Sequence, residues 1–323
     1  MIRAFMKGVA CACMALGLSS CGQMQPAQPP KMEIGEVQVS PEITLRRLVY
    51  RPARPKGTVL FLYGFPETIY SWKGIAQELS SDYEVHAFDW PGYGQSSRPS
   101  PERFAYSPRD YAQVLKDYIR TSGIDTSRLV IYGTDIGTLP ALLAALDDPH
   151  IAKRIIAGDF APFNRPQYMQ ENLQALKAKP SSDVVHAAMN KGRDEIVRNA
   201  YRRGFAKEEQ FDLPQEVQDD WIKGWGSPPL TAADAFYHYY SYFTRDQDYF
   251  EANLARLKTP LTVVWGERDF YIKKEMGKEL AERTGARFVV LPKMGHYPHL
   301  QNPKGTVDEV RAAFVEEKPA SGY

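Results

Sequence analysis

Short apolar runs bounded by glycine, proline or aspartate recur along the chain from about Ile43 onward. They are rich in β-branched residues and too short for helices, which is typical of strands buried on both faces of a parallel sheet. The runs cover residues 58–62, 85–89, 129–132, 155–157, 261–265 and 288–291. Helical patterns lie between them, at 108–121, 138–146, 275–284 and 304–315. This alternation predicts a parallel sheet covered by helices on both faces.

The interval from about residue 160 to residue 250 breaks the alternation. It holds helical and aromatic sequence with no convincing strand. An all-helical insertion between two parallel strands is expected to lie over the carboxyl ends of the strands, where such sheets bind ligands. We therefore predict a core formed by residues 42–159 and 251–320, with residues 160–250 as a helical cap.

The first residues have the pattern of an export signal. Arg3 and Lys7 precede an apolar stretch, 8–18, that is too short to span a bilayer. The tetrapeptide 18–21, Leu-Ser-Ser-Cys, then resembles a bacterial lipobox. That resemblance implies cleavage before Cys21 and lipidation of its thiol. The alternative is an ordinary secretory signal with a coincidental cysteine.

Residues 1–20 are accordingly expected to be a lipoprotein signal peptide, and the Pro- and Gln-rich residues 21–41 a tether. Lipid on Cys21 would anchor an exported protein in the bacterial envelope. By analogy with Gram-negative lipoproteins, Gly22 favours the periplasmic face of the outer membrane over the inner membrane. Cys11 and Cys13 leave with the signal, so the mature chain would have no internal disulfide.

Composition and charge mainly exclude classes of function. The 323 residues include 40 Lys plus Arg and 39 Asp plus Glu, which gives a net charge of +1 with histidine neutral. Because no strongly basic field exists, nucleic-acid binding is not expected. With 43% hydrophobic residues, the chain is long enough for one large core. We expect a small-molecule substrate as its partner, and membrane contact only through the N-terminal lipid.

The most informative segment joins the run at 129–132 to the helix that follows. It reads Gly133-Thr-Asp-Ile-Gly137, with a glycine two residues to either side of Asp135. This spacing is typical of the strand-to-helix elbow of α/β-hydrolases, where the central residue is usually serine. A carboxylate suits displacement at an sp³ carbon that bears a leaving group, and it gives an alkyl-enzyme ester that water cleaves. The alternative is that Asp135 only caps the next helix of an inactive relative.

Candidates for the general base and its acid follow later strands. His296 lies in a Met-Gly-His sequence after the last run, where a loop can bring it over the elbow to deprotonate water. His299 is the nearby competitor. Asp269 stands after the preceding run, at the usual place of the acid that orients the histidine. Asp159, which closes the run at 155–157, is the alternative acid.

The segment from Tyr63 to Pro99 carries a specific resemblance. Gly64-Phe65-Pro66 and Asp89-Trp-Pro-Gly-Tyr-Gly-Gln-Ser96 resemble the epoxide hydrolase and haloalkane dehalogenase branch of the α/β-hydrolases, although Tyr63 replaces an expected histidine. The resemblance covers roughly residues 45–320. It implies an α/β-hydrolase fold with a mostly parallel eight-stranded sheet, helices on both faces and an inserted helical cap. It implies that the amides of Phe65 and Ile136 are the oxyanion donors. No metal or organic cofactor is implied.

The leaving group separates the two activities of this branch. A halide needs N–H donors, yet Ile136 follows the aspartate and Phe65 occupies the oxyanion turn. An epoxide oxygen needs an acidic O–H, which cap tyrosines supply in epoxide hydrolases. Residues 236–243 read Phe-Tyr-His-Tyr-Tyr-Ser-Tyr-Phe. Counting back without gaps from residues 258–260 puts Tyr239 at the position of the ring-opening tyrosine, with Tyr240 and Tyr237 as alternatives.

The sequence therefore predicts an epoxide hydrolase. Asp135 attacks an epoxide carbon, a cap tyrosine protonates the oxygen, and water activated by His296 and Asp269 releases a diol. One alternative is a haloalkane or haloacid dehalogenase with the same aspartate and histidine. An alternative of another class is a catalytically silent lipoprotein that binds an apolar ligand in the cap cleft.

Overall fold

The structure of the protein, a computed structural model, describes Met1 and residues 30–315. The predicted signal peptide, Cys21 and most of the predicted tether lie outside the described residues. Within the part of the chain that the structure describes, no helix is long and apolar enough to cross a membrane.

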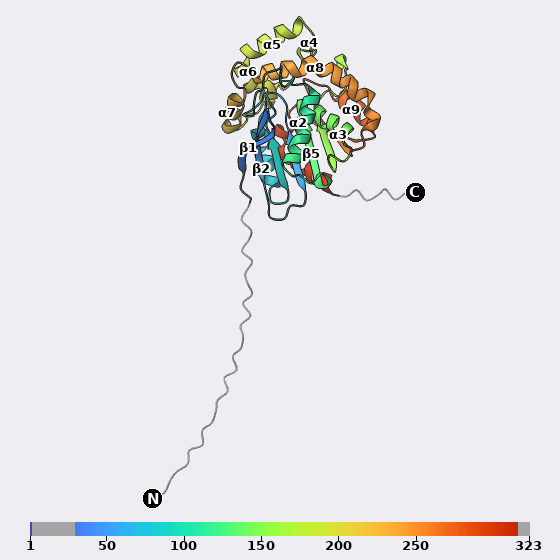
Figure 1. The fold of residues 1–323 in the computed structure, drawn as a ribbon. Coiled ribbons are helices and arrows are strands. Elements are labelled where there is room, and N and C mark those ends of the chain that lie inside the picture. Colours follow the sequence, from blue (N-terminus) through green and yellow to red (C-terminus); the bar gives the residue numbers. More distant parts are fainter. Residues whose placement is uncertain (2–29, 316–323) are drawn as a thin grey trace, which may run out of the picture.

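A single eight-stranded sheet forms the centre of the described fold, in the strand order β1-β2-β4-β3-β5-β6-β7-β8 (Figure 1). The strands are β1 (Glu33–Ser40), β2 (Ile43–Tyr50), β3 (Thr58–Leu62), β4 (Glu84–Phe88), β5 (Leu129–Thr134), β6 (Arg154–Gly158), β7 (Leu261–Gly266) and β8 (Arg287–Leu291). β2 runs antiparallel to its neighbours β1 and β4, and all other neighbouring pairs are parallel. The predicted fold class is thus confirmed.

Helices of the core pack on this sheet, and helices of the insertion lie beyond its carboxyl edge. The core helices are α1 (Lys73–Leu79), α2 (Pro108–Thr121), α3 (Thr138–Asp147), α9 (Lys274–Thr284), α10 (Pro298–Gln301) and α11 (Pro303–Phe314). α2 packs against α3 in front of the sheet in Figure 1, and α1 packs against α11. Local sequence explains the start of α2, because the side chains of Ser107 and Asp110 form a capping box around Pro108.

The insertion lies between β6 and β7 and is helical, as the sequence indicated. Its helices are α4 (Glu171–Ala175), α5 (Ser181–Lys191), α6 (Arg193–Asn199), α7 (Gln215–Gly224) and α8 (Ala232–Ala252). They form the upper layer of the molecule in Figure 1, above the sheet. Since β6 and β7 are parallel neighbours, the chain leaves the sheet at the carboxyl end of β6 and crosses back to the amino end of β7 after the insertion.

The predicted C-terminal boundary of the tether is wrong. Residues 33–40, which we assigned to the tether, form β1 and pair antiparallel with β2. β1 lies at the edge of the sheet, and most of its side chains are exposed. An edge strand with little buried surface has no apolar alternation, so its sequence gives no strand signal.

A buried ion network joins the cap to the core. The guanidinium of Arg46, on β2, donates two hydrogen bonds to Asp220 of α7, at 2.8 and 2.7 Å. The Nε of Arg46 lies 2.5 Å from Asp89, which follows β4. All three side chains are less than 10% exposed. Because buried charges are stable only when they are paired, this network fixes α7 over the end of the sheet.

Replacing Arg46 by methionine is expected to lower the free energy of unfolding by about 3–5 kcal/mol, since Asp89 and Asp220 would stay buried without their counter-charge. Urea denaturation measures the change. Arg103, which pairs with Glu42 at an exposed position, provides the control, and Arg103→Met should cost less than about 1 kcal/mol. Equal losses in the two variants would contradict a structural role for the buried network.

Candidate active site

Asp135 stands at the turn between β5 and α3, at the carboxyl edge of the sheet. Its backbone is left-handed, with φ 48°, which is uncommon for a residue other than glycine. Tight packing at the elbow explains Gly137, because a Cβ there would lie 2.7 Å from the carbonyl oxygen of Tyr63. The turn therefore presents the Asp135 carboxylate away from the sheet, at the position that the sequence predicted for a nucleophile.

The loop after β3 approaches this carboxylate closely. The backbone N–H of Phe65 donates to Asp135 Oδ2 at 2.9 Å. Gly64 faces the same group, and a Cβ on it would lie 2.2 Å from Oδ2, so a side chain here would displace the carboxylate. The Phe65–Pro66 peptide bond is cis. The Tyr297 hydroxyl donates to the carbonyl oxygen of Phe65 at 2.9 Å and so helps to hold the loop.

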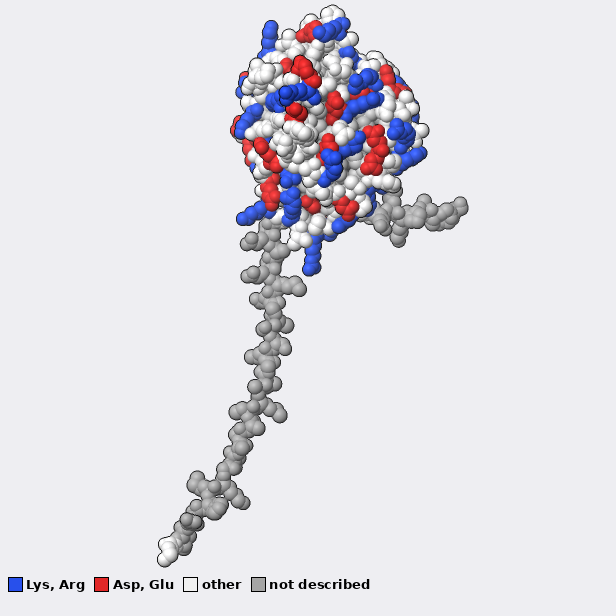
Figure 2. Space-filling view, viewed as in Figure 1, with Lys and Arg blue, Asp and Glu red and all other residues white. Residues whose placement is uncertain are grey.

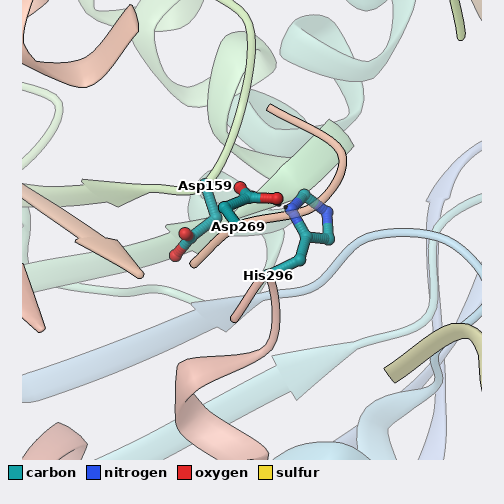
Figure 3. A group of neighbouring side chains, drawn as sticks. All are labelled: Asp159, Asp269 and His296. Carbon is teal, nitrogen blue, oxygen red and sulfur yellow. Dashed lines mark hydrogen bonds and ion pairs between the residues drawn. The ribbon is translucent and has the colours of Figure 1, made fainter. Parts of the chain in front are cut away.

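His296 and Asp269 form a hydrogen-bonded pair beside Asp135. His296 Nδ1 lies 2.8 Å from Asp269 Oδ2, as the dashed line in Figure 3 marks. The other ring nitrogen, Nε2, lies 3.9 Å from Asp135 Oδ2, which is longer than a hydrogen bond. The second oxygen of Asp269 accepts the backbone N–H groups of Tyr271 and Ile272 at 2.8 and 3.0 Å. Asp269 is thereby fixed in position to orient the imidazole.

Asp159 lies next to this pair without a contact of its own to the histidine. Its Oδ1 accepts the N–H of Gly266 at 2.9 Å, and its Oδ2 is buried with no partner among the described residues. One atom from each of Asp159, Asp269 and His296 falls within 4.8 Å of the others, a spacing that a metal ion also requires. The hydrogen bonds of Asp269 account for the arrangement without an ion. Of the two predicted acids, the structure thus places Asp269 against the imidazole.

The charges of this site are coupled. Burial raises the pKa of Asp135 above its ordinary value, while His296 and the Phe65 amide oppose the rise. Burial alone would lower the pKa of His296, but the charges of Asp269 and Asp135 outweigh it and raise this pKa well above its ordinary value. Two carboxylates therefore hold a proton on the imidazole. For His296 to act as a base, one of these negative charges has to disappear first.

His299, the competing base, is engaged elsewhere. Its Nε2 lies 2.7 Å from Glu67, and both side chains are almost fully buried. Its ring stacks on Trp72, with the ring centroids 4.3 Å apart. Glu67 in turn accepts the backbone N–H of Gly64 at 3.2 Å. The pair therefore supports the loop that carries Phe65, and His299 is absent from the cavity lining.

A cavity of about 380 Å³ separates the cap from the carboxyl ends of the strands. Its core wall consists of Phe65, Asp135, Tyr271, His296 and Tyr297. Mostly apolar side chains of α4, α5 and α6 form the opposite wall, and the ion pair of Arg203 with Glu195 adds charge. Both the proposed nucleophile and the proposed base thus reach one mostly apolar space, which suits a small apolar substrate.

Two of the three predicted cap tyrosines do not present a free hydroxyl to this cavity. Tyr239 is fully buried, and its hydroxyl donates to the carbonyl oxygen of Ile136 at 3.2 Å. Tyr237 is partly exposed, and its hydroxyl donates to Asp183 at 2.8 Å. Both hydroxyls already have acceptors in the protein.

Tyr240 differs from them. Its side chain is buried, and its hydroxyl makes no hydrogen bond to any described residue. The ring contacts Phe236, a cavity-lining residue, with 4.7 Å between ring centroids. Burial raises the pKa of Tyr240 well above its ordinary value, and the charge of Asp135 adds to the rise. Tyr240 therefore keeps a proton to donate and packs on a residue of the cavity lining, although it is not itself one of the lining residues.

Sequence reasoning missed three further tyrosines around Asp135. Tyr271 and Tyr297 line the cavity, and each lies within two residues of a predicted catalytic residue, a signal that was available. Tyr93 has a fully buried hydroxyl without a partner among the described residues. Burial and the charge of Asp135 raise the pKa of Tyr93 well above its ordinary value. It lies inside the segment 89–96, which suggested a family but no role for this side chain.

Comparisons with known proteins agree with this fold. Residues 57–303 match the model of the alpha/beta hydrolase fold family, so the chain belongs to that family and is a hydrolase of the α/β fold. "Epoxide hydrolase 3" of Xenopus tropicalis is 24% identical over 288 residues, which cover 80% of this chain and 71% of that protein. "Fluoroacetate dehalogenase" of a Burkholderia species is 34% identical over 106 residues, which cover 32% of this chain and 34% of that protein.

Solved structures show the same fold. The crystal structure of Epoxide Hydrolase A from Mycobacterium thermoresistibile superposes with a TM-score of 0.70 at 19% identity, over 88% of this chain and 98% of that one. At these identities, the solved structures establish the α/β-hydrolase fold.

Glu309, on α11, provides a pH-dependent test of packing beneath the site. It accepts the Tyr132 hydroxyl at 2.8 Å, and burial raises its pKa from 4.5 to about 7. Because the folded state binds this proton more tightly than the unfolded state, the protein loses stability as pH rises from the unfolded pKa through the folded one. Glu309→Gln should therefore stabilise the protein more at about pH 8 than at about pH 5, by up to about 3 kcal/mol. Urea unfolding at both pH values measures this, with exposed Glu42→Gln as control. An equal effect of Glu309→Gln at both pH values would contradict the shift.

Proposed function

We propose that this hydrolase is an epoxide hydrolase that works through an alkyl ester of Asp135. The observation that carries the proposal is the placement of the Asp135 carboxylate, held by the Phe65 amide at 2.9 Å and faced by the His296–Asp269 pair. A carboxylate in this position suits attack on an sp³ carbon. The similarity to epoxide hydrolases along most of the chain supports the same activity.

In the first step, the two carboxylate oxygens have different roles. Oδ2 already accepts the Phe65 N–H, so Oδ1 attacks the epoxide carbon. The new C–O bond forms as the ring C–O bond breaks, and the ring oxygen takes a proton from a tyrosine hydroxyl. The product is an alkyl ester whose carbonyl oxygen, Oδ2, lies in the oxyanion site, with the Ile136 amide as the proposed second donor.

Esterification of Asp135 prepares the second step. The ester is neutral, so one of the two charges that hold a proton on His296 is removed and its pKa falls. The proton of the imidazole can then pass to the tyrosinate, which restores the donor. Neutral His296, oriented by Asp269, takes a proton from water as the water attacks the ester carbonyl carbon. Collapse of the tetrahedral intermediate returns that proton to the departing alkoxide and releases a diol.

Among the three cap tyrosines, Tyr240 is the ring-opening donor that the contacts support best. The hydroxyls of Tyr239 and Tyr237 are committed to Ile136 and Asp183, whereas the Tyr240 hydroxyl is not committed to any described residue. The sequence placed Tyr239 first and Tyr240 among the alternatives, so the contacts reverse that order.

A dehalogenase would need N–H donors for the leaving halide. The side chains of Phe65 and Ile136, beside the nucleophile, supply none. The cap contributes Gln170, Asn172 and Arg203 as side-chain N–H donors to the lining, and Arg203 is already paired with Glu195.

We also propose that lipid on Cys21 anchors the enzyme in the bacterial envelope, from the lipobox-like sequence 18–21. Cys21→Ser is expected to release the protein from the membrane fraction, and retention there would contradict the anchor.

Blocking the base should trap the ester. In His296→Gln, ring opening should proceed while hydrolysis of the ester slows by at least about 100-fold. After incubation with a panel of epoxides, mass spectrometry should show a mass gain on the peptide that contains Asp135. Asp135→Ala is the control and should show none. A mass gain only with haloalkanes would establish the dehalogenase instead, and no adduct with either class would favour a silent ligand-binding protein.

The donor assignment is tested by three matched variants. Tyr240→Phe should slow formation of the ester by about 100-fold, because the ring oxygen loses its proton source. Tyr237→Phe should change the rate by less than about twofold, since its hydroxyl is already bonded to Asp183. Rapid-quench measurement of ester formation separates these outcomes. A larger loss in Tyr239→Phe than in Tyr240→Phe would return the role to Tyr239.

A further inference from the structure

The site contains one more carboxyl group than the proposed mechanism uses. Asp159 directly follows β6, and Asp269 follows β7, so the parallel pairing of these strands brings the two side chains to the same edge of the sheet. Asp159 is fully buried, and its backbone is left-handed with φ 50°. Figure 3 shows the two side chains next to each other, with the carboxyl of Asp269 directed at the ring of His296 and that of Asp159 directed away from it.

Hydrogen bonds distinguish the two carboxyls. Asp269 accepts two backbone N–H groups with one oxygen and contacts His296 Nδ1 with the other, so both of its oxygens have partners. Asp159 accepts a single N–H, from Gly266, and its other oxygen is buried without a partner among the described residues. A buried anionic oxygen without a donor is strongly unfavourable, whereas a protonated carboxyl is much less so.

The charges around Asp159 also favour its protonated form. The negative charge of Asp269 and that of Glu309 both oppose its ionisation, while His296 and the Gly266 N–H favour it. Burial is the largest cause, and the pKa of Asp159 lies well above its ordinary value. Two carboxylates this close in a buried site cannot both ionise easily, so one keeps a proton.

We propose that Asp159 is a positioning residue that keeps this proton, so that the two carboxyls present one negative charge to His296 and can exchange it. The inference rests on the proposed role of His296 as base. A single charge orients the imidazole but does not hold its proton as firmly as two charges would. If Asp269 is neutralised, Asp159 can release its proton and supply the missing charge from within 4.8 Å.

Infrared spectroscopy tests the protonation state without any substrate. With isotope-labelled aspartate, the carbonyl band of a protonated carboxylic acid should be present in the wild type at neutral pH and absent from Asp159→Asn. Aspartate labelling keeps Glu309 out of the comparison. The band should also disappear in Asp269→Asn, because Asp159 then ionises. A wild-type spectrum without a band assignable to Asp159, or persistence of that band in Asp269→Asn, would overturn the proposal.

Kinetics test the exchange of charge. Hydrolysis of the preformed Asp135 ester should slow about two- to fivefold in Asp159→Asn and about 100-fold in Asp269→Asn. The double variant should be slower than the product of these losses by at least about tenfold, because no carboxyl remains to orient His296. Losses that simply multiply would overturn the proposal. If the wild type forms no ester with any probe, the proposed function fails, while the infrared result still decides the protonation of Asp159.

Discussion

The arrangement of the site follows from one contact, the hydrogen bond between the Phe65 amide and the Asp135 carboxylate. A buried carboxylate needs donors and nearby positive charge, because water no longer solvates it. The loop after β3 supplies the amide, and its own position depends on Tyr297 and on the Glu67–His299 pair. The protonated imidazole of His296 supplies the charge. Elements that are distant in sequence are thus required to meet at one carboxylate.

The division between core and cap separates two physical tasks. The core fixes reacting groups at the ends of parallel strands, where backbone geometry holds them rigidly. The cap closes a cavity over them and contributes mostly apolar side chains. The buried network of Arg46 and Asp220 ties α7 to the core, while α4, α5 and α6 provide the wall of the cavity. The identity of the substrate therefore depends mainly on the cap.

The sequence predicted the parts of the fold that local chemistry determines. β3 and α2 have the predicted bounds, because every side chain of β3 is buried and α2 begins at a capping box. β1 was missed because it is largely exposed. β2 was not singled out, since Arg46 interrupts its apolar pattern and is buried only through partners far along the chain.

The candidate site shows the same distinction between features that local sequence determines and features that tertiary contacts determine. Asp135, Asp269 and His296 each follow a strand of one sheet, so the order of elements alone indicated that they would meet. The choice among tyrosines depends on which hydroxyls find acceptors when α8 packs on the core, and no sequence pattern encodes that. The uneven hydrogen bonding of Asp159 and Asp269 likewise depends on tertiary contacts.

The central claim is that the diol forms by hydrolysis of an Asp135 ester rather than by direct attack of water on the substrate. A single turnover with excess enzyme in water labelled with heavy oxygen tests this most directly. If the ester forms, the label enters the Asp135 carboxylate and the first diol released carries none, because its new oxygen came from the protein. Label in the diol of that first turnover, with an unlabelled Asp135 peptide, would contradict the account.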